Sequence, residues 1–205
     1  YHELYGLLKS RDPSSQVAIG GVSQPTPLRL RYLDTILDTY ERRYGGPMPV
    51  DVWNVHNFVL REELDSWGVD IPPGMPDRTG RLYEISDHDD MAIFRKQIRE
   101  FRQWMKDRGQ QNKPLIVTEY GILMPGEYGF PPPNVERFML DTFEFFRTAA
   151  DPDLGYPADG GRLVQRWCWF SLISERYPTG DLLRSGAAGL TSLGQAFAKY
   201  AGVSP

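Results

Sequence analysis

Four short, mostly apolar segments alternate with segments of helical periodicity, and this alternation constrains the fold more than any other feature. We expect strands at residues 16–22, 50–60, 114–121 and 164–172. Strands that are almost continuously apolar are typical of a parallel sheet covered on both faces. Apolar residues recur at helical spacing over residues 1–10, 28–44, 87–108, 135–146 and 192–201. The chain is therefore predicted to be an α/β protein built from right-handed β/α units in a single domain, residues 1–205.

The composition narrows the classes of function. The chain is 40% hydrophobic and 24% charged, as is ordinary for a soluble globular protein. Its net charge is −4 with scattered lysines and arginines, so we expect no nucleic-acid partner. No apolar run reaches the roughly 20 residues that span a bilayer, so we expect no membrane segment. Residues 1–20 do not resemble a signal peptide, which leaves the localisation open.

No cofactor is expected. Gly20 and Gly21 are followed by prolines rather than by a helix, so neither a nucleotide nor a dinucleotide fingerprint is present. Cys168 is the single cysteine, which excludes an intrachain disulfide and a cysteine-based zinc site. Because Cys168 lies between two tryptophans, we expect it to be a small buried hydrophobe.

The candidate catalytic residue is Glu119, at the end of the third predicted strand. Active sites of parallel α/β folds lie at the carboxyl ends of the strands. A carboxylate that follows Leu-Ile-Val is expensive to bury unless it has partners or a chemical task. We predict that Glu119 is functional, and the alternative is a structural ion pair with Arg166.

Five further residues are candidates for substrate binding. His56 shares strand parity with Asn54, so both can point toward Glu119, although a hydrogen-bonded core histidine is the alternative. Aromatic residues make up 13% of the chain, and rings at strand ends can stack on sugars or pack in the core. On this basis the candidates are Trp169, which could floor a sugar subsite, together with Tyr120 and Trp53.

The cluster Asp87-His88-Asp89-Asp90 raises the possibility of a metal site. Acidic residues in the first turn of a helix are, however, what the helix dipole favours. We therefore interpret the cluster as a helix cap and predict no bound metal.

The chain resembles the second half of the (β/α)8-barrel glycoside hydrolases known as clan A. Residues 115–121 (LIVTEYG) are similar to the seventh strand, which ends in the nucleophile, and residues 166–171 (RWCWFS) to the eighth. Residues 53–57 resemble the sixth strand, residues 16–24 the fifth, and residues 1–13 the fourth helix. The resemblance implies that Glu119 is the nucleophile of a retaining mechanism, that Trp169 is the platform of the −1 subsite, and that His56 can hydrogen-bond in the site.

The family's acid/base glutamate, at the end of the fourth strand, would precede Tyr1, and Glu3 lies in a helix instead. Retaining hydrolysis uses two carboxyl groups about 5–5.5 Å apart. Four strands also leave two sheet edges open. The missing N-terminal half-barrel could come from the same gene product, from a second copy in a homodimer, or the sheet could stay open under its loops.

Two functions follow from these observations. The first is a retaining O-glycoside hydrolase, or the nucleophile-bearing part of one, that acts on a poly- or oligosaccharide. The alternative is a non-catalytic carbohydrate-binding or scaffold protein derived from a glycosidase barrel.

Overall fold

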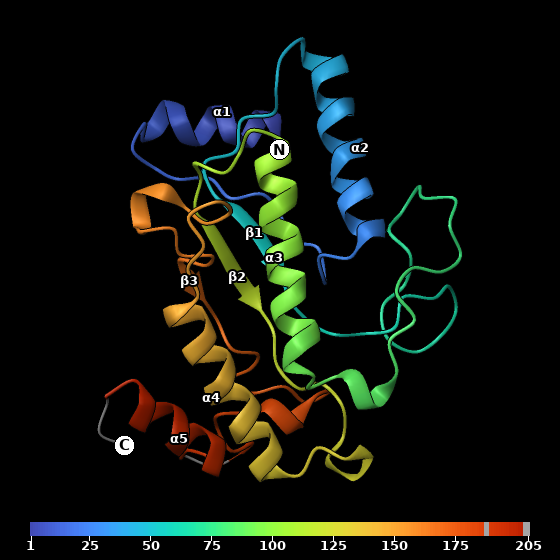
Figure 1. Cartoon of the computed structure of the whole chain (residues 1–205), viewed down its shortest axis with the longest axis vertical. Helices are drawn as coiled ribbons and strands as arrows, with labels where there is room; N and C mark the ends of the chain where they lie inside the picture. The colour runs from blue at the N-terminus through green and yellow to red at the C-terminus, as the bar shows by residue number, and fades with distance from the viewer. Residues whose placement is uncertain (187–188, 203–205) are drawn as a thin grey trace.

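The computed structural model describes residues 1–186 and 189–202, and this part forms a mixed α/β fold (Figure 1). Its parallel sheet has the strand order β1-β2-β3. The elements in chain order are α1 His2–Arg11, α2 Pro27–Tyr44, β1 Trp53–His56, α3 Met91–Asp107, β2 Leu115–Glu119, α4 Pro132–Thr148, β3 Arg166–Trp167 and α5 Ser192–Tyr200. Four short 3-10 turns lie between them, η1 Ile85–Asp87, η2 Gly126–Tyr128, η3 Pro157–Asp159 and η4 Pro178–Gly180.

The strand predicted over residues 16–22 is a single parallel bridge, Ala18 to Val52, so the sheet has three named strands instead of four. The segment still lies beside β1, since the His56 amide donates to the Val22 carbonyl at 2.9 Å. Gly20 and Gly21 interrupt the segment, and glycine weakens a strand because it has no side chain to pack. The predicted position of this segment is confirmed, but the prediction that it forms a regular strand was wrong.

All five predicted helices are confirmed, and their ends follow local chemistry. Pro27 begins α2, and Gly45 ends it in the left-handed conformation with φ of 75°. The Asp90 carboxylate caps α3 by accepting from the amides of Ala92 and Ile93. Asp87 and Glu84 form a capping box around η1, so the capping role predicted for the acidic cluster is confirmed.

The hydrophobic core lies between one face of the sheet and the helices α3 and α4. Side chains of alternate strand residues enter this layer, where they meet aromatic residues of both helices. The strand residues are Trp53, Val55, Leu115 and Val117, all at most 1% exposed. On the helices, the aromatic partners are Phe94, Phe101, Phe138, Phe143 and Phe146.

The opposite face of the sheet is less covered by the described residues. Asn54, His56, Ile116 and Thr118 are half-buried there, and Arg166 is exposed. Cys168 is also exposed, so the expectation that it is buried was wrong. It continues the alternation of β3 beyond Trp167 and lies at the free edge of the sheet, where no further strand covers it within the described residues.

A buried ion pair anchors the long loop after β1. Arg29 Nε of α2 lies 2.7 Å from Glu62 Oε1, and the two side chains are 8% and 0% exposed. The same carboxylate accepts from the Thr26 hydroxyl and from the Arg81 amide. Gly80 must lack a side chain, because a Cβ there would lie 2.4 Å from Glu62 Oε2. The two ends of the loop are thus held against α2.

Within the described residues, no helix is long and apolar enough to cross a membrane.

Candidate active site

Glu119 is turned toward the less covered face of the sheet by a β-bulge. Val55 pairs with Val117, but the next residue of β1, His56, pairs with Glu119, so Thr118 is an extra residue on β2. Because side chains alternate between faces, one extra residue moves every following side chain to the other face. Without the bulge, Glu119 would point into the helical layer with Val117.

The Glu119 carboxylate remains accessible. Its side chain is 44% exposed, and Glu119 Oε2 lies 3.6 Å from His56 Nδ1. Among the described residues, no arginine or lysine nitrogen lies within 4.0 Å of the Glu119 carboxylate, so the ion pair with Arg166 that we considered does not form there. A carboxylate that is not neutralised by a cation keeps its negative charge available for a substrate.

His56 lies between Glu119 and the Gly20–Gly21 segment. Burial lowers the pKa of His56, and the charge of Glu119 partly opposes this effect. The imidazole is therefore mostly neutral near pH 7 and can donate a hydrogen bond from one ring nitrogen. A Cβ at Gly21 would lie 2.7 Å from His56 Cδ2, so only glycine leaves room for the ring in this position.

Asn54 completes a polar strip with His56 and Glu119. The Thr118 hydroxyl donates to Asn54 Oδ1 at 2.7 Å, which fixes the orientation of the amide. The Asn54 amide nitrogen is thereby left to donate elsewhere on this face. The structure thus brings together three of the six candidate residues at the carboxyl ends of β1 and β2.

The other three candidates lie in the layer between the sheet and the helices. Trp169 is 8% exposed, and its indole nitrogen donates to the Gly180 carbonyl at 2.8 Å. Its ring packs edge-on against Tyr120 at 5.5 Å between centroids, and Tyr120 is fully buried. Trp53 is 1% exposed and packs edge-on against Trp104 at 4.9 Å. Core packing, the alternative we weighed, describes the positions of all three rings.

His88 is a site-supporting residue that the sequence analysis treated only as part of a cap. It is 1% exposed, and burial lowers its pKa to about 4. The Leu123 amide donates to His88 Nε2 at 2.9 Å, so the proton of the neutral ring is on Nδ1, which donates to the Val59 carbonyl at 2.8 Å. His88 therefore joins the loop after β1 to the loop after β2.

A row of aromatic rings also escaped the sequence analysis. Starting at His56, neighbouring rings follow one another through Phe58 and Phe170 to Tyr177, with centroids 6.4, 6.2 and 6.5 Å apart. The sequence offered one signal for this row, which is that Phe58 shares strand parity with His56. No sequence pattern indicated that Phe170 and Tyr177 lie beside Phe58.

Two other features do not form a site. Within residues 1–186 and 189–202, no group of three His, Cys, Asp or Glu side chains could hold a metal ion.

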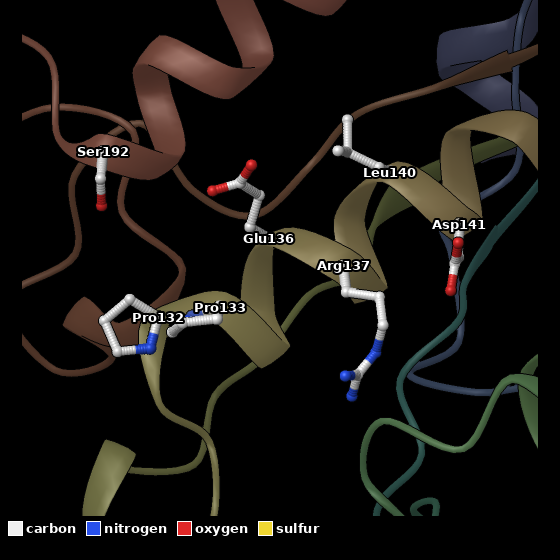
Figure 2. A pocket seen from close by; sticks show the side chains of 7 residues that line it. All are labelled: Pro132, Pro133, Glu136, Arg137, Leu140, Asp141 and Ser192. Atoms are coloured by element: carbon white, nitrogen blue, oxygen red, sulfur yellow. The ribbon is translucent and has the colours of Figure 1, made fainter.

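A hollow of about 520 Å³ lies on the outside of α4, near the start of α5 (Figure 2). Its charged side chains diverge, as Glu136 and Arg137 extend in opposite directions (Figure 2). They converge on no common point where a ligand could be held.

Comparison with known proteins shows a similarity of fold to solved structures. No known protein family and no curated protein matches the sequence. A GH128 subgroup I endo-β-1,3-glucanase from Amycolatopsis mediterranei superposes with a TM-score of 0.52 at 17% identity, covering 96% of this chain and 62% of that one. A monomeric β-xylosidase from Caulobacter crescentus superposes with a TM-score of 0.51 at 16% identity, covering 97% and 36%. The chain spans less than two thirds of either length.

The chain is therefore similar in fold to these two glycoside hydrolases. The likeness is one of fold, and the described residues form a mixed α/β arrangement with three parallel strands.

Proposed function

We propose that this chain belongs to a retaining glycoside hydrolase that acts on a poly- or oligosaccharide, with Glu119 as the nucleophile. The observation that carries the proposal is the bulge at Thr118. It places a part-exposed carboxylate, beside a mostly neutral histidine, at the carboxyl end of a parallel strand. This is where enzymes with barrel folds carry their reacting groups.

The proposed reaction uses the two-step retaining route. A Glu119 carboxylate oxygen attacks the anomeric carbon, and the glycosidic C–O bond breaks with its electron pair going to the departing oxygen. A second carboxylic acid protonates that oxygen, and water then hydrolyses the glycosyl ester. His56 would orient the carboxylate by a hydrogen bond, and Asn54 would donate to a sugar hydroxyl.

The second carboxyl group is assigned to further β/α units that complete the barrel. Support comes from the surfaces left uncovered at the ends of the sheet. Helix α1 has no buried residue and exposes Leu4, Leu7 and Leu8, which are 64%, 54% and 47% exposed. At the β3 edge, an apolar groove of about 450 Å³ lies beside Trp167 and Leu172. The completing units could come from the same gene product or from a second copy. Light scattering tests the second alternative, for which we expect a dimer.

The names of the two superposed enzymes suggest β-1,3-glucan and xylan fragments as the first substrates to assay. A dinitrophenyl leaving group departs without protonation, so dinitrophenyl β-glucoside and β-xyloside report on the nucleophile alone.

The test compares Glu119→Gln with Glu127→Gln, an exposed glutamate of η2, in the full-length protein. We expect Glu119→Gln to lose about 10⁴-fold or more in kcat on the activated glycoside, and Glu127→Gln to retain the wild-type rate. Equal rates in both variants would overturn the assignment. Sugar binding without turnover in the wild-type protein would instead favour the non-catalytic carbohydrate-binding alternative.

A further inference from the structure

Another concave surface lies beyond the polar strip, where the loops after all three strands meet. It is a cleft of about 280 Å³, and its lining comes from loops that are far apart in sequence. Its lining includes Leu60 and Trp67 after β1, Met124 and Tyr128 after β2, and Arg176 and Tyr177 after β3. In Figure 1, the arrow of β2 points toward the end of the molecule that carries the η2 turn, which includes Tyr128.

The lining has the chemistry of a carbohydrate subsite. Three aromatic rings contribute to it, and Tyr128 is 57% exposed. Leu60 and Met124 add apolar surface to the same lining. The Arg176 guanidinium lies 5.3 Å from the centroid of the Tyr177 ring. Flat rings pack against the apolar face of a sugar, while tyrosine hydroxyls and a guanidinium can bond its hydroxyl groups.

The size of the cleft limits its occupant. Pockets for drug-sized ligands measure about 300–1,000 Å³, and this cleft lies just below that range. One sugar ring is an occupant of that size, while a folded peptide element is larger.

The cleft is held in place by the contacts of two further lining residues, Gly68 and Leu123. Gly68, next to Trp67, is pressed against the Arg61 carbonyl, since a Cβ there would lie 2.3 Å from that oxygen. The amide of Leu123, next to Met124, is fixed by its hydrogen bond to His88. A cleft formed before the ligand arrives costs little ordering entropy on binding.

The aromatic row connects this cleft to Glu119. It begins at His56, which is 3.6 Å from the carboxylate, and ends at Tyr177, which lines the cleft. We propose that the cleft is a distal subsite that binds one sugar unit of a chain whose scissile bond lies at Glu119. This inference rests on the proposed function and adds to it that the substrate is a chain of several sugar units.

The experiment measures the dependence of activity on chain length. In the full-length protein, kcat/KM is determined on laminarihexaose, on xylohexaose and on the matching dinitrophenyl glycoside, for Trp67→Ala and Tyr128→Ala. The control is Tyr44→Ala, a 43% exposed tyrosine of α2. We expect the ratio of hexasaccharide to aryl-glycoside kcat/KM to fall about tenfold in both cleft variants and to stay unchanged in the control. An unchanged ratio in Tyr128→Ala, whose exposed side chain is not needed for folding, would overturn the proposal.

A binding measurement separates this inference from the catalytic one. Calorimetry on the Glu119→Gln protein measures hexasaccharide binding, and adding Tyr128→Ala should weaken that binding about tenfold. If Glu119→Gln retains activity but Tyr128→Ala still weakens binding, the catalytic assignment fails and the subsite stands. If Glu119→Gln is inactive and Tyr128→Ala leaves binding unchanged, only the subsite fails.

Discussion

His56 Nδ1 lies 3.6 Å from Glu119 Oε2, and the two residues are paired across β1 and β2 directly after the register shifts by one residue. The contact exists because of that shift. An unshifted β2 would present Thr118 opposite His56, and Glu119 would face the phenylalanines of α3 and α4. The same extra residue that breaks the regularity of the sheet thus produces the pair.

The position of His56 depends on Gly21. We predict that Gly21→Ala displaces the imidazole, because the new Cβ would lie 2.7 Å from Cδ2 and 3.0 Å from Nε2. A displacement near 1 Å at a reacting group can cost about 10²-fold in rate, and we expect a loss of that order on the activated glycoside. NMR titration of the His56 ring should show a change in its pKa.

Gly20→Ala is the matched control for this prediction. A Cβ at Gly20 meets no atom within 4 Å, so activity and the His56 titration should match the wild type. Equal losses in the two variants would show that the segment as a whole, and not the space beside His56, is what matters.

We predict that removing Glu62 from the buried ion pair strongly lowers the free energy of unfolding. Glu62→Ala leaves the Arg29 guanidinium buried without its carboxylate, and breaking such a pair costs about 3–5 kcal/mol. Glu63→Ala removes a carboxylate that is 33% exposed and pairs with Arg61, and should cost about 1 kcal/mol or less. Urea unfolding measures both, and similar costs would contradict the role given to Glu62.

Because His88 is buried and neutral, we expect the protein to lose stability in mild acid. Its folded pKa of about 4 lies below the ordinary 6.5, so the unfolded chain binds the proton more readily. The stabilisation by neutral His88 is fully present above pH 6.5 and is lost as the pH falls toward 4. The free energy of unfolding should fall by about 3 kcal/mol over this range. Urea unfolding at several pH values should show this decline.

His88→Ala should remove the part of that decline that His88 causes, and should cost stability at pH 7. The Val59 carbonyl and the Leu123 amide lose their partner, at about 1–3 kcal/mol each. His2→Ala alters an exposed histidine of α1 and should keep the wild-type decline. An undiminished decline in His88→Ala would assign the acid sensitivity to other groups.

Barrel completion predicts a change in the reactivity of Cys168. It is the single cysteine and is exposed at the free β3 edge, so a maleimide should label the 205-residue chain rapidly. Once further β/α units pair with β3, labelling should slow at least tenfold, because the strand edge is covered. Mass spectrometry follows the labelling, and an equal rate in a completed assembly would contradict pairing at this edge.

The helices and β2 were predictable because their signals are local. The stripe from Met91 to Met105 and the run at residues 115–119 show their periodicity in any context. The position of Glu119 at the end of a strand was also predictable, because it follows an apolar run.

The remaining features depend on contacts between distant segments. The bulge is a property of the pairing of β1 with β2, and no single strand encodes it. Aromatic residues at strand ends suggested sugar contacts, yet Trp53 and Trp169 have the parity that faces the helices. The bulge at Thr118 turns Tyr120 to the same side. The cleft of Trp67, Tyr128 and Tyr177 is built from three loops, and sequence spacing does not predict how loops meet.

Covalent trapping tests the central claim most directly. A 2-fluoro glycoside with a dinitrophenyl leaving group slows both steps of the retaining route, and the good leaving group lets the glycosyl-enzyme accumulate. Peptide mapping by mass spectrometry should then locate one fluoro-sugar on Glu119 of the full-length protein. A label on another carboxylate, or turnover of the parent glycoside with no covalent intermediate and with inverted stereochemistry, would contradict the account.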